Sequence, residues 1–128
     1  IAILKDIPKI LVYDLAKFYN SQNIFNLIPK KIISRDPSAE LRANQKDSDS
    51  LPPYMILDKI LEYYIESGKE VGEISKLLKV KKSLVIKIII KINNSEFKRK
   101  QGPPGIKITS KAFGRDRRYP ITNGFKEA

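Results

Sequence analysis

Tyr54-Met-Ile-Leu-Asp-Lys-Ile-Leu-Glu-Tyr-Tyr64 opens the stretch that decides the fold, which runs to Asn93. Apolar residues recur along it at the three- and four-residue spacing of a helix face, and Gly68 suits the position just after a helix C-terminus. The spacing predicts helices over 54–67, 71–78 and 83–93, with Ser83 as the N-cap of the last one. The residues predicted to face inward are Ile56, Leu57, Ile60, Leu61, Tyr64, Leu84, Val85, Ile88, Ile89 and Ile92. The sequence therefore predicts a helical unit over residues 54–94.

The N-terminal residues predict a strand followed by a helix. Ile1-Ala-Ile-Leu4 is a short apolar run, which is typical of a buried strand in a parallel sheet. Asp6 is a candidate N-cap, and Pro8 suits the first turn of a helix. Apolar residues at helical spacing between Leu11 and Tyr19 predict an amphipathic helix over 7–20 that packs on a sheet. Residues 1–33 are therefore expected to belong to an α/β core. A chain that opens inside a buried strand, without an initiator Met, is expected to be a piece of a longer protein.

Two segments lack helical periodicity and are expected to form loops. Residues 34–53 contain three prolines, and residues 95–128 are rich in Gly and Pro. Both mix charges and isolated aromatic residues with Pro or Gly, a composition typical of stiff polar loops. We interpret residues 95–128 as a basic loop and tail that an anionic ligand or a neighbouring subunit would order.

The charge is divided unevenly along the chain. Residues 1–75 carry 10 basic and 11 acidic side chains, whereas residues 76–128 carry 15 basic and 3 acidic ones, a net charge of +12. Such a block suits a polyanion or an acidic neighbouring subunit, although a lysine-rich solvated face would look the same. The chain has no Cys and no His, which excludes disulfides, thiolate sites and histidine catalysis. No apolar run reaches the roughly 18 residues of a membrane span, so a cytoplasmic location is expected.

A helix-turn-helix module is the alternative interpretation of the helical unit. Glu73-Ile-Ser-Lys-Leu-Leu-Lys-Val-Lys-Lys-Ser-Leu-Val-Ile-Lys87 is close to that pattern, and its second helix is basic. A recognition helix needs polar side chains that reach base edges, however, and this helix offers only lysines and Ser83. Lysines contact phosphates without reading sequence. The pattern favours a helical packing unit over a reader of DNA, and the nucleic-acid hypothesis stays open on these residues alone.

Four pieces of the sequence, taken in order, resemble a known family. They are the segment from Ile3 to Ala16, the two-part loop Asp36-Pro-Ser-Ala-Glu-Leu-Arg42 and Asp47-Ser-Asp-Ser-Leu-Pro-Pro-Tyr54, the loop Glu96-Phe-Lys-Arg-Lys-Gln-Gly-Pro-Pro-Gly105, and the segment Ala112-Phe-Gly-Arg-Asp-Arg-Arg-Tyr-Pro120. Together they resemble the C-terminal part of the synthetase domain of glutamine-dependent NAD synthetase. The resemblance implies an α/β fold class, in which residues 1–128 form the mostly helical C-terminal portion of a Rossmann-like ATP-pyrophosphatase (adenine nucleotide alpha hydrolase-like) domain. In that scheme residues 34–53 are a substrate loop.

The resemblance also implies an activity. Such enzymes activate the nicotinate carboxylate of deamido-NAD with ATP as an adenylate, and ammonia released from glutamine then displaces AMP to give NAD. It implies a homo-oligomer built through paired synthetase domains, with no membrane partner and with nucleic acid not expected. The family's Ser-Gly-Gly-x-Asp-Ser phosphate loop, its Mg²⁺ ligands and its glutaminase Glu-Lys-Cys triad are expected upstream of Ile1, so this chain alone lacks the full catalytic machinery.

The resemblance carries site residues onto matching positions. Lys9 and Ser38 match residues that bind ATP, and Lys98, with Phe97 beside it, matches a residue that contacts deamido-NAD. A lysine in the first turn of a helix opposes the helix dipole, which makes sense if phosphates neutralise it. The hydroxyl of Ser38, on a loop stiffened by Pro37, is suited to donate a hydrogen bond to a phosphate. Each could equally be an ordinary surface residue, and the resemblance assigns no catalytic residue and no metal ligand to this chain.

Overall fold

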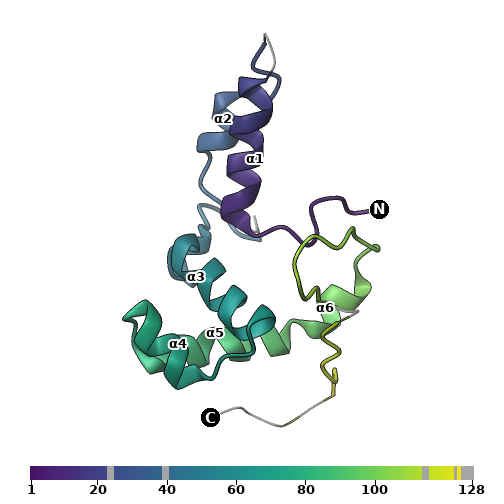
Figure 1. Cartoon of the computed structure of the whole chain (residues 1–128). Coiled ribbons are helices and arrows are strands. Elements are labelled where there is room, and N and C mark those ends of the chain that lie inside the picture. The colour runs from purple at the N-terminus through teal and green to yellow at the C-terminus, as the bar shows by residue number, and fades with distance from the viewer. Residues whose placement is uncertain (23–24, 39–40, 114–115, 123, 125–128) are drawn as a thin grey trace.

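The computed structural model describes residues 1–22, 25–38, 41–113, 116–122 and 124, and these residues are mainly helical (Figure 1). In chain order the elements are α1 (Lys9–Ser21), α2 (Lys30–Ser34), the 3₁₀ turn η1 (Asp47–Asp49), α3 (Tyr54–Leu61), the π-helical turn η2 (Glu62–Glu66), α4 (Val71–Leu78), α5 (Lys82–Asn94) and α6 (Glu96–Gln101). Ala39, Glu40, Gly114 and Arg115, which belong to the family-like motifs, lie outside the described residues.

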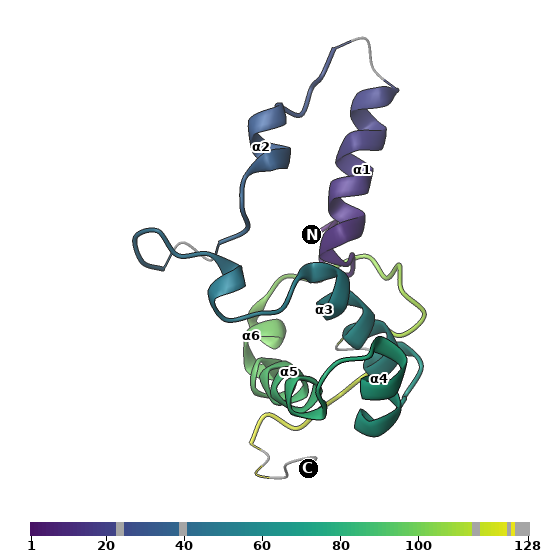
Figure 2. The ribbon, with the colours of Figure 1, turned by 90° about the vertical axis from the view of Figure 1, so that its left-hand side faces the viewer.

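The elements form a helical body with an arm. Helices α3, α4 and α5 pack together as the body, and α1 with α2 stands away from it (Figures 1 and 2). The first residues of the chain lie beside α6 at one side of the body (Figure 1). No helix in the described part of the chain is long and apolar enough to span a membrane.

The core of the body confirms the predicted helical unit. Its buried residues are Ile60, Ile65, Ile74, Val85, Ile88, Ile89 and Ile92. The predicted inward residues Ile56, Leu57, Leu61, Tyr64 and Leu84 pack against this cluster as half-buried neighbours. The helix over 71–78 has the predicted bounds, and Gly68 adopts a φ of +63°, the left-handed conformation that favours glycine after a helix.

Two helix starts differ from their predicted caps. Lys81, not Ser83, holds the N-cap position of α5, and Ser83 is the second residue of that helix. Helix α1 begins at Lys9 after Pro8, so Asp6 lies outside it. The Asp6 carboxylate instead accepts hydrogen bonds from a distant segment, at Ile108 and Thr109. A local capping signature could not reveal a partner that lies about a hundred residues away in the chain.

The predicted strand at Ile1–Leu4 is wrong. Ala2 makes an isolated parallel bridge with Gly105, and Ile1 and Ile3 are 89% and 64% exposed. A strand needs a neighbouring strand to complete its backbone hydrogen bonds, and the described residues supply only this one bridge here. The helix that was expected to pack on a sheet does form as α1, but none of its residues is buried. The described residues are thus mainly helical, which is consistent with part of a larger domain.

The expected absence of helix after Ser95 is also wrong. Residues Glu96–Gln101 form α6, a short helix that follows α5 after Ser95. The sequence of α6 has no apolar face that periodicity could reveal. Polar contacts of Glu96 and Arg99 hold this helix in place. The segment 34–53 is a loop as predicted, with one short turn at Asp47–Asp49.

Candidate functional site

The short helix α6 presents Phe97 and Lys98 to solvent. Both side chains are exposed, and the Lys98 ammonium lies 5.9 Å from the centre of the Phe97 ring. The preceding residue, Glu96, is 1% exposed and fixes the first turn of the helix in the body. The structure therefore places the two predicted dinucleotide-binding residues on a firmly seated element.

A buried ion pair holds α6 in place. Arg99 donates from Nη2 to Glu96 Oε2 at 2.9 Å and from Nε to the same oxygen at 3.3 Å, and it also donates to the carbonyl of Ile92. The guanidinium lies 4.5 Å from the centre of the Phe113 ring. Sequence reasoning missed this network. The signals that could have found it are the i,i+3 spacing of Glu96 and Arg99 and the Gly-Pro pair that ends the helix.

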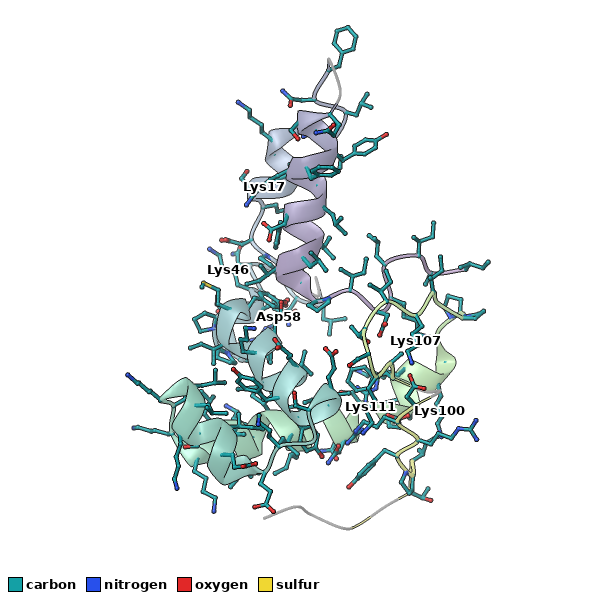
Figure 3. All side chains as sticks on the ribbon, in the orientation of Figure 1. Lys17, Lys46, Asp58, Lys100, Lys107 and Lys111 are labelled. Atoms are coloured by element: carbon teal, nitrogen blue, oxygen red, sulfur yellow. The ribbon has the colours of Figure 1, made fainter. Side chains whose placement is uncertain are left out.

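A pocket of about 320 Å³ lies between α6 and the N-terminal segment; we call it the α6 pocket. Its wall includes the cations Lys5, Arg99, Lys100 and Lys107, the carboxylates Asp6 and Glu96, and the apolar residues Ile106 and Phe113. Figure 3 shows Lys100, Lys107 and Lys111 gathered beside α6. Lys107 is paired with Asp116 at 2.7 Å. The excess of cations makes this side of the molecule suited to an anionic ligand.

A second pocket, of about 250 Å³, lies between the start of α1 and the helix α3; we call it the α1 pocket. Lys9 lines it, together with Lys111 and three carboxylates from α3 and η2. Asp58, labelled in Figure 3 where α3 meets α1, accepts a hydrogen bond from the backbone N–H of Ile10 at 2.9 Å. This carboxylate satisfies one of the free N–H groups at the start of α1 and so fixes the turn that carries Lys9.

The loop that carries Ser38 is tied back to α3. The Asp47 N–H donates to the carbonyl of Pro37 at 2.9 Å, and Lys46 forms an ion pair with Asp36 at 2.6 Å. The Tyr54 hydroxyl donates to Asp47. Burial raises the pKa of Tyr54 well above its usual range, and the hydrogen bond to Asp47 adds to the shift. Tyr54 therefore stays protonated and keeps the loop closed.

The structure brings some of the predicted site residues together and separates others. Tyr54 lines both the α1 pocket and a smaller one of about 100 Å³ that Pro37 also lines, so Lys9 and the Ser38 loop both lie near this tyrosine. Phe97 and Lys98 line neither the α6 pocket nor the α1 pocket. The α6 pocket and the α1 pocket share Lys5, Asp6 and Phe113 as wall residues.

The described residues do not offer a metal site. No group of three or more His, Cys, Asp or Glu side chains in the described ranges is arranged to hold an ion. The carboxylates near the pockets are used instead as acceptors for backbone N–H groups, as Asp6 and Asp58 are. The described residues therefore supply no ligand set for a Mg²⁺ ion.

Comparison with known proteins decides the family. The sequence model of NAD synthase matches residues 1–102. The chain belongs to the NAD synthase family. This NAD synthase segment is 48% identical over 126 residues to a glutamine-dependent NAD(+) synthetase of Acinetobacter baylyi and 44% identical over 126 residues to one of Thermotoga maritima.

The match covers nearly all of this chain and a small part of each relative. It spans 98% of the chain but 23% of the Acinetobacter baylyi protein and 22% of the Thermotoga maritima protein. A solved structure of glutamine-dependent NAD+ synthetase from Acinetobacter baumannii, in complex with ADP, is 40% identical, with a TM-score of 0.55. It aligns with 94% of this chain and 20% of its own. These matches give no support to a helix-turn-helix module.

Proposed function

We propose that this chain is part of a glutamine-dependent NAD synthetase, an ATP-dependent ligase that converts deamido-NAD to NAD. The observation that carries the proposal is the 48% identity over 126 residues to a protein of that name. Adenylation supplies the leaving group that a carboxylate lacks, so the task of the protein is mainly to position the reactants and to stabilise charge. Lys100 and Lys107 in the wall of the α6 pocket and Lys9 in the wall of the α1 pocket are suited to that task.

The proposal assigns roles to the residues that match the family. Lys9, in the first turn of α1, would pair with ATP phosphates, and Ser38 would donate to them from its closed loop. Lys98 would pair with a pyrophosphate or carboxylate oxygen of deamido-NAD, beside the Phe97 ring. Support comes from the exposure of Phe97 and Lys98 on α6 and from the place of Lys9 in the wall of a pocket.

The proposal extends to the rest of the enzyme. We assign residues 1–33 to the core of a Rossmann-like ATP-pyrophosphatase domain, residues 34–53 to a substrate loop, residues 54–94 to a helical unit and residues 95–128 to a basic loop and tail. Mg²⁺ would be held by residues outside this chain. A homo-oligomer through synthetase-domain contacts and a cytoplasmic location complete the proposal.

The nitrogen donor tests the proposal directly. The complete protein that contains this chain is expected to form NAD from deamido-NAD and ATP with either glutamine or ammonia as the nitrogen source. The measurement is NAD formation with each donor in turn, with AMP release as a check on the adenylate route. Amide formation from ammonia but never from glutamine would show that the protein is not of the glutamine-dependent kind.

Replacing Lys9 by alanine is expected to weaken the use of ATP more than that of deamido-NAD. A lost charge-assisted hydrogen bond costs about 1.5–3 kcal/mol, which corresponds to roughly a 10- to 150-fold rise in the KM for ATP. Lys17→Ala is the matched control, because Lys17 lies on the same helix in an exposed pair with Asp14. If the two variants had the same KM for ATP, Lys9 would be a surface cation without a role in ATP binding.

A further inference from the structure

We propose that Lys5 and Asp6 position helix α6, which carries Phe97 and Lys98, through the loop that follows it, and that they do so without touching the substrate. The inference rests on the proposed role of Phe97 and Lys98 in binding deamido-NAD. It goes beyond that role because neither Lys5 nor Asp6 belongs to the residues that match a ligand contact.

Lys5 closes the C-terminal end of α6. Its ammonium donates to the carbonyl oxygens of Arg99, Gly102 and Pro103, at 3.4, 3.5 and 2.7 Å. Arg99 carries one of the last four carbonyls of α6, which lack partners within the helix and form the negative end of its dipole, and Gly102 and Pro103 follow the helix. The Lys5 ammonium supplies hydrogen bonds to these carbonyls, and its positive charge interacts favourably with the negative end of the helix dipole. Because the Lys5 ammonium donates to three carbonyls, its hydrogen bonds are used by the end of α6 and the loop that follows.

Asp6 holds the segment that follows. Its Oδ2 atom accepts hydrogen bonds from the backbone N–H groups of Ile108 and Thr109 and from the Thr109 hydroxyl, each at 2.8 Å. Lys5 therefore contacts the start of the segment 99–109, and Asp6 contacts its end.

A backbone contact between Ala2 and the loop completes the grip. The Ala2 N–H donates to the Pro104 carbonyl at 2.9 Å, and Ala2 forms a parallel bridge with Gly105. A Cβ atom added at Gly105 would lie 2.7 Å from the Cβ of Lys5 and 3.0 Å from the carbonyl oxygen of Ala2. Only glycine allows the loop to approach this closely.

The position of Lys98 depends on this grip because α6 is too short to be stable alone. A six-residue helix gains few internal hydrogen bonds for the cost of its first turn. It is fixed at its start by the buried Glu96 and at its end by Lys5, and Phe97 and Lys98 lie between these two points. Releasing the C-terminal end of α6 would let Phe97 and Lys98 change direction, although neither side chain is itself altered.

The test is the kinetics of Lys5→Met in the complete protein. We expect the KM for deamido-NAD to rise about fivefold, while kcat and the KM for ATP stay within twofold. The modest size follows from the exposure of the Lys5 contacts, which solvent weakens. Lys5→Arg, which can still donate to the carbonyls, is expected to recover most of the loss. A purely structural role would lower activity through the amount of folded protein and would leave both KM values unchanged.

Lys91→Met is the matched control. Lys91 donates to the carbonyl of Ser50 at 3.0 Å, so this change also removes a lysine–carbonyl contact between distant segments. It lies outside the loop and is expected to leave the KM for deamido-NAD unchanged. A similar rise in both methionine variants would overturn the positioning role, as would an unchanged KM in Lys5→Met.

Lys98→Ala separates the two proposals. If Lys98→Ala raises the KM for deamido-NAD and Lys5→Met does not, the positioning role is wrong and the site assignment stands. If Lys98→Ala has no effect, the assignment of the site itself is wrong, and with it the inference. Direct titration of each variant with deamido-NAD in the absence of ATP gives the same comparison without catalysis.

Discussion

Replacing Arg99 by methionine is expected to destabilise the protein by about 3–5 kcal/mol, because it leaves a buried carboxylate without its cation. Glu96 is 1% exposed, and Arg99 supplies two hydrogen bonds to its Oε2 atom. The other carboxylate oxygen, Oε1, has no hydrogen-bond partner among the described residues. Removing Arg99 also removes the bond to the Ile92 carbonyl and the contact with the Phe113 ring. Urea denaturation followed by circular dichroism measures the loss.

Lys59→Met is the control for the effect of burial. Lys59 and Glu62 also form an i,i+3 ion pair, at 2.7 Å, but their side chains are 54% and 45% exposed. Exposed pairs contribute little, so this variant is expected to leave the stability almost unchanged. Adding Glu96→Gln to Arg99→Met removes the stranded charge and is expected to recover part of the loss. Equal losses in the Arg99 and Lys59 variants would show that the burial of Glu96 is not the cause.

Replacing Ile88 by alanine is expected to cost about 2–5 kcal/mol, because it opens a cavity where α5 packs on α3 and α4. Ile88 is 1% exposed and belongs to the buried cluster of the body. Ile90 lies two residues further along the same helix and is 36% exposed. Ile90→Ala makes the same chemical change and alters helix propensity by the same amount. The difference in stability between the two variants therefore measures the effect of burial.

The expected loss for Ile90→Ala is about 1 kcal/mol or less, because Ile90 is 36% exposed and lies outside the buried cluster, so its removal opens no enclosed cavity. The midpoint of urea denaturation compares the two variants directly. If both lost the same stability, α5 would not face the core with Ile88, and the helical unit would pack in another register.

Local periodicity was sufficient for the helical unit. The spacing of Ile60, Ile88 and Ile92 marks the buried face of each helix, and that spacing is a property of neighbouring residues. Gly68 likewise marks a helix end through its own backbone freedom. The family-like motifs were also readable without a structure, because they are short runs of defined residues. The roles of Lys9, Ser38, Phe97 and Lys98 stay predictions.

Only the tertiary structure decided what the polar residues at the two ends of the chain do. Asp6 reads locally as a helix cap, yet its partners are Ile108 and Thr109. Glu96 reads as one more charge in a polar run, yet it is buried against Arg99. Ile1–Leu4 reads as a strand, but a strand depends on neighbours, and here the described residues give it one bridge. The sequence by itself determined the helical unit over residues 54–94 and the resemblance to the family, because both lie in local patterns. The contacts of Asp6 and of the apolar N-terminus depended on segments about a hundred residues away, which no local pattern specifies. The burial of Glu96 depended on how α6 packs against α5.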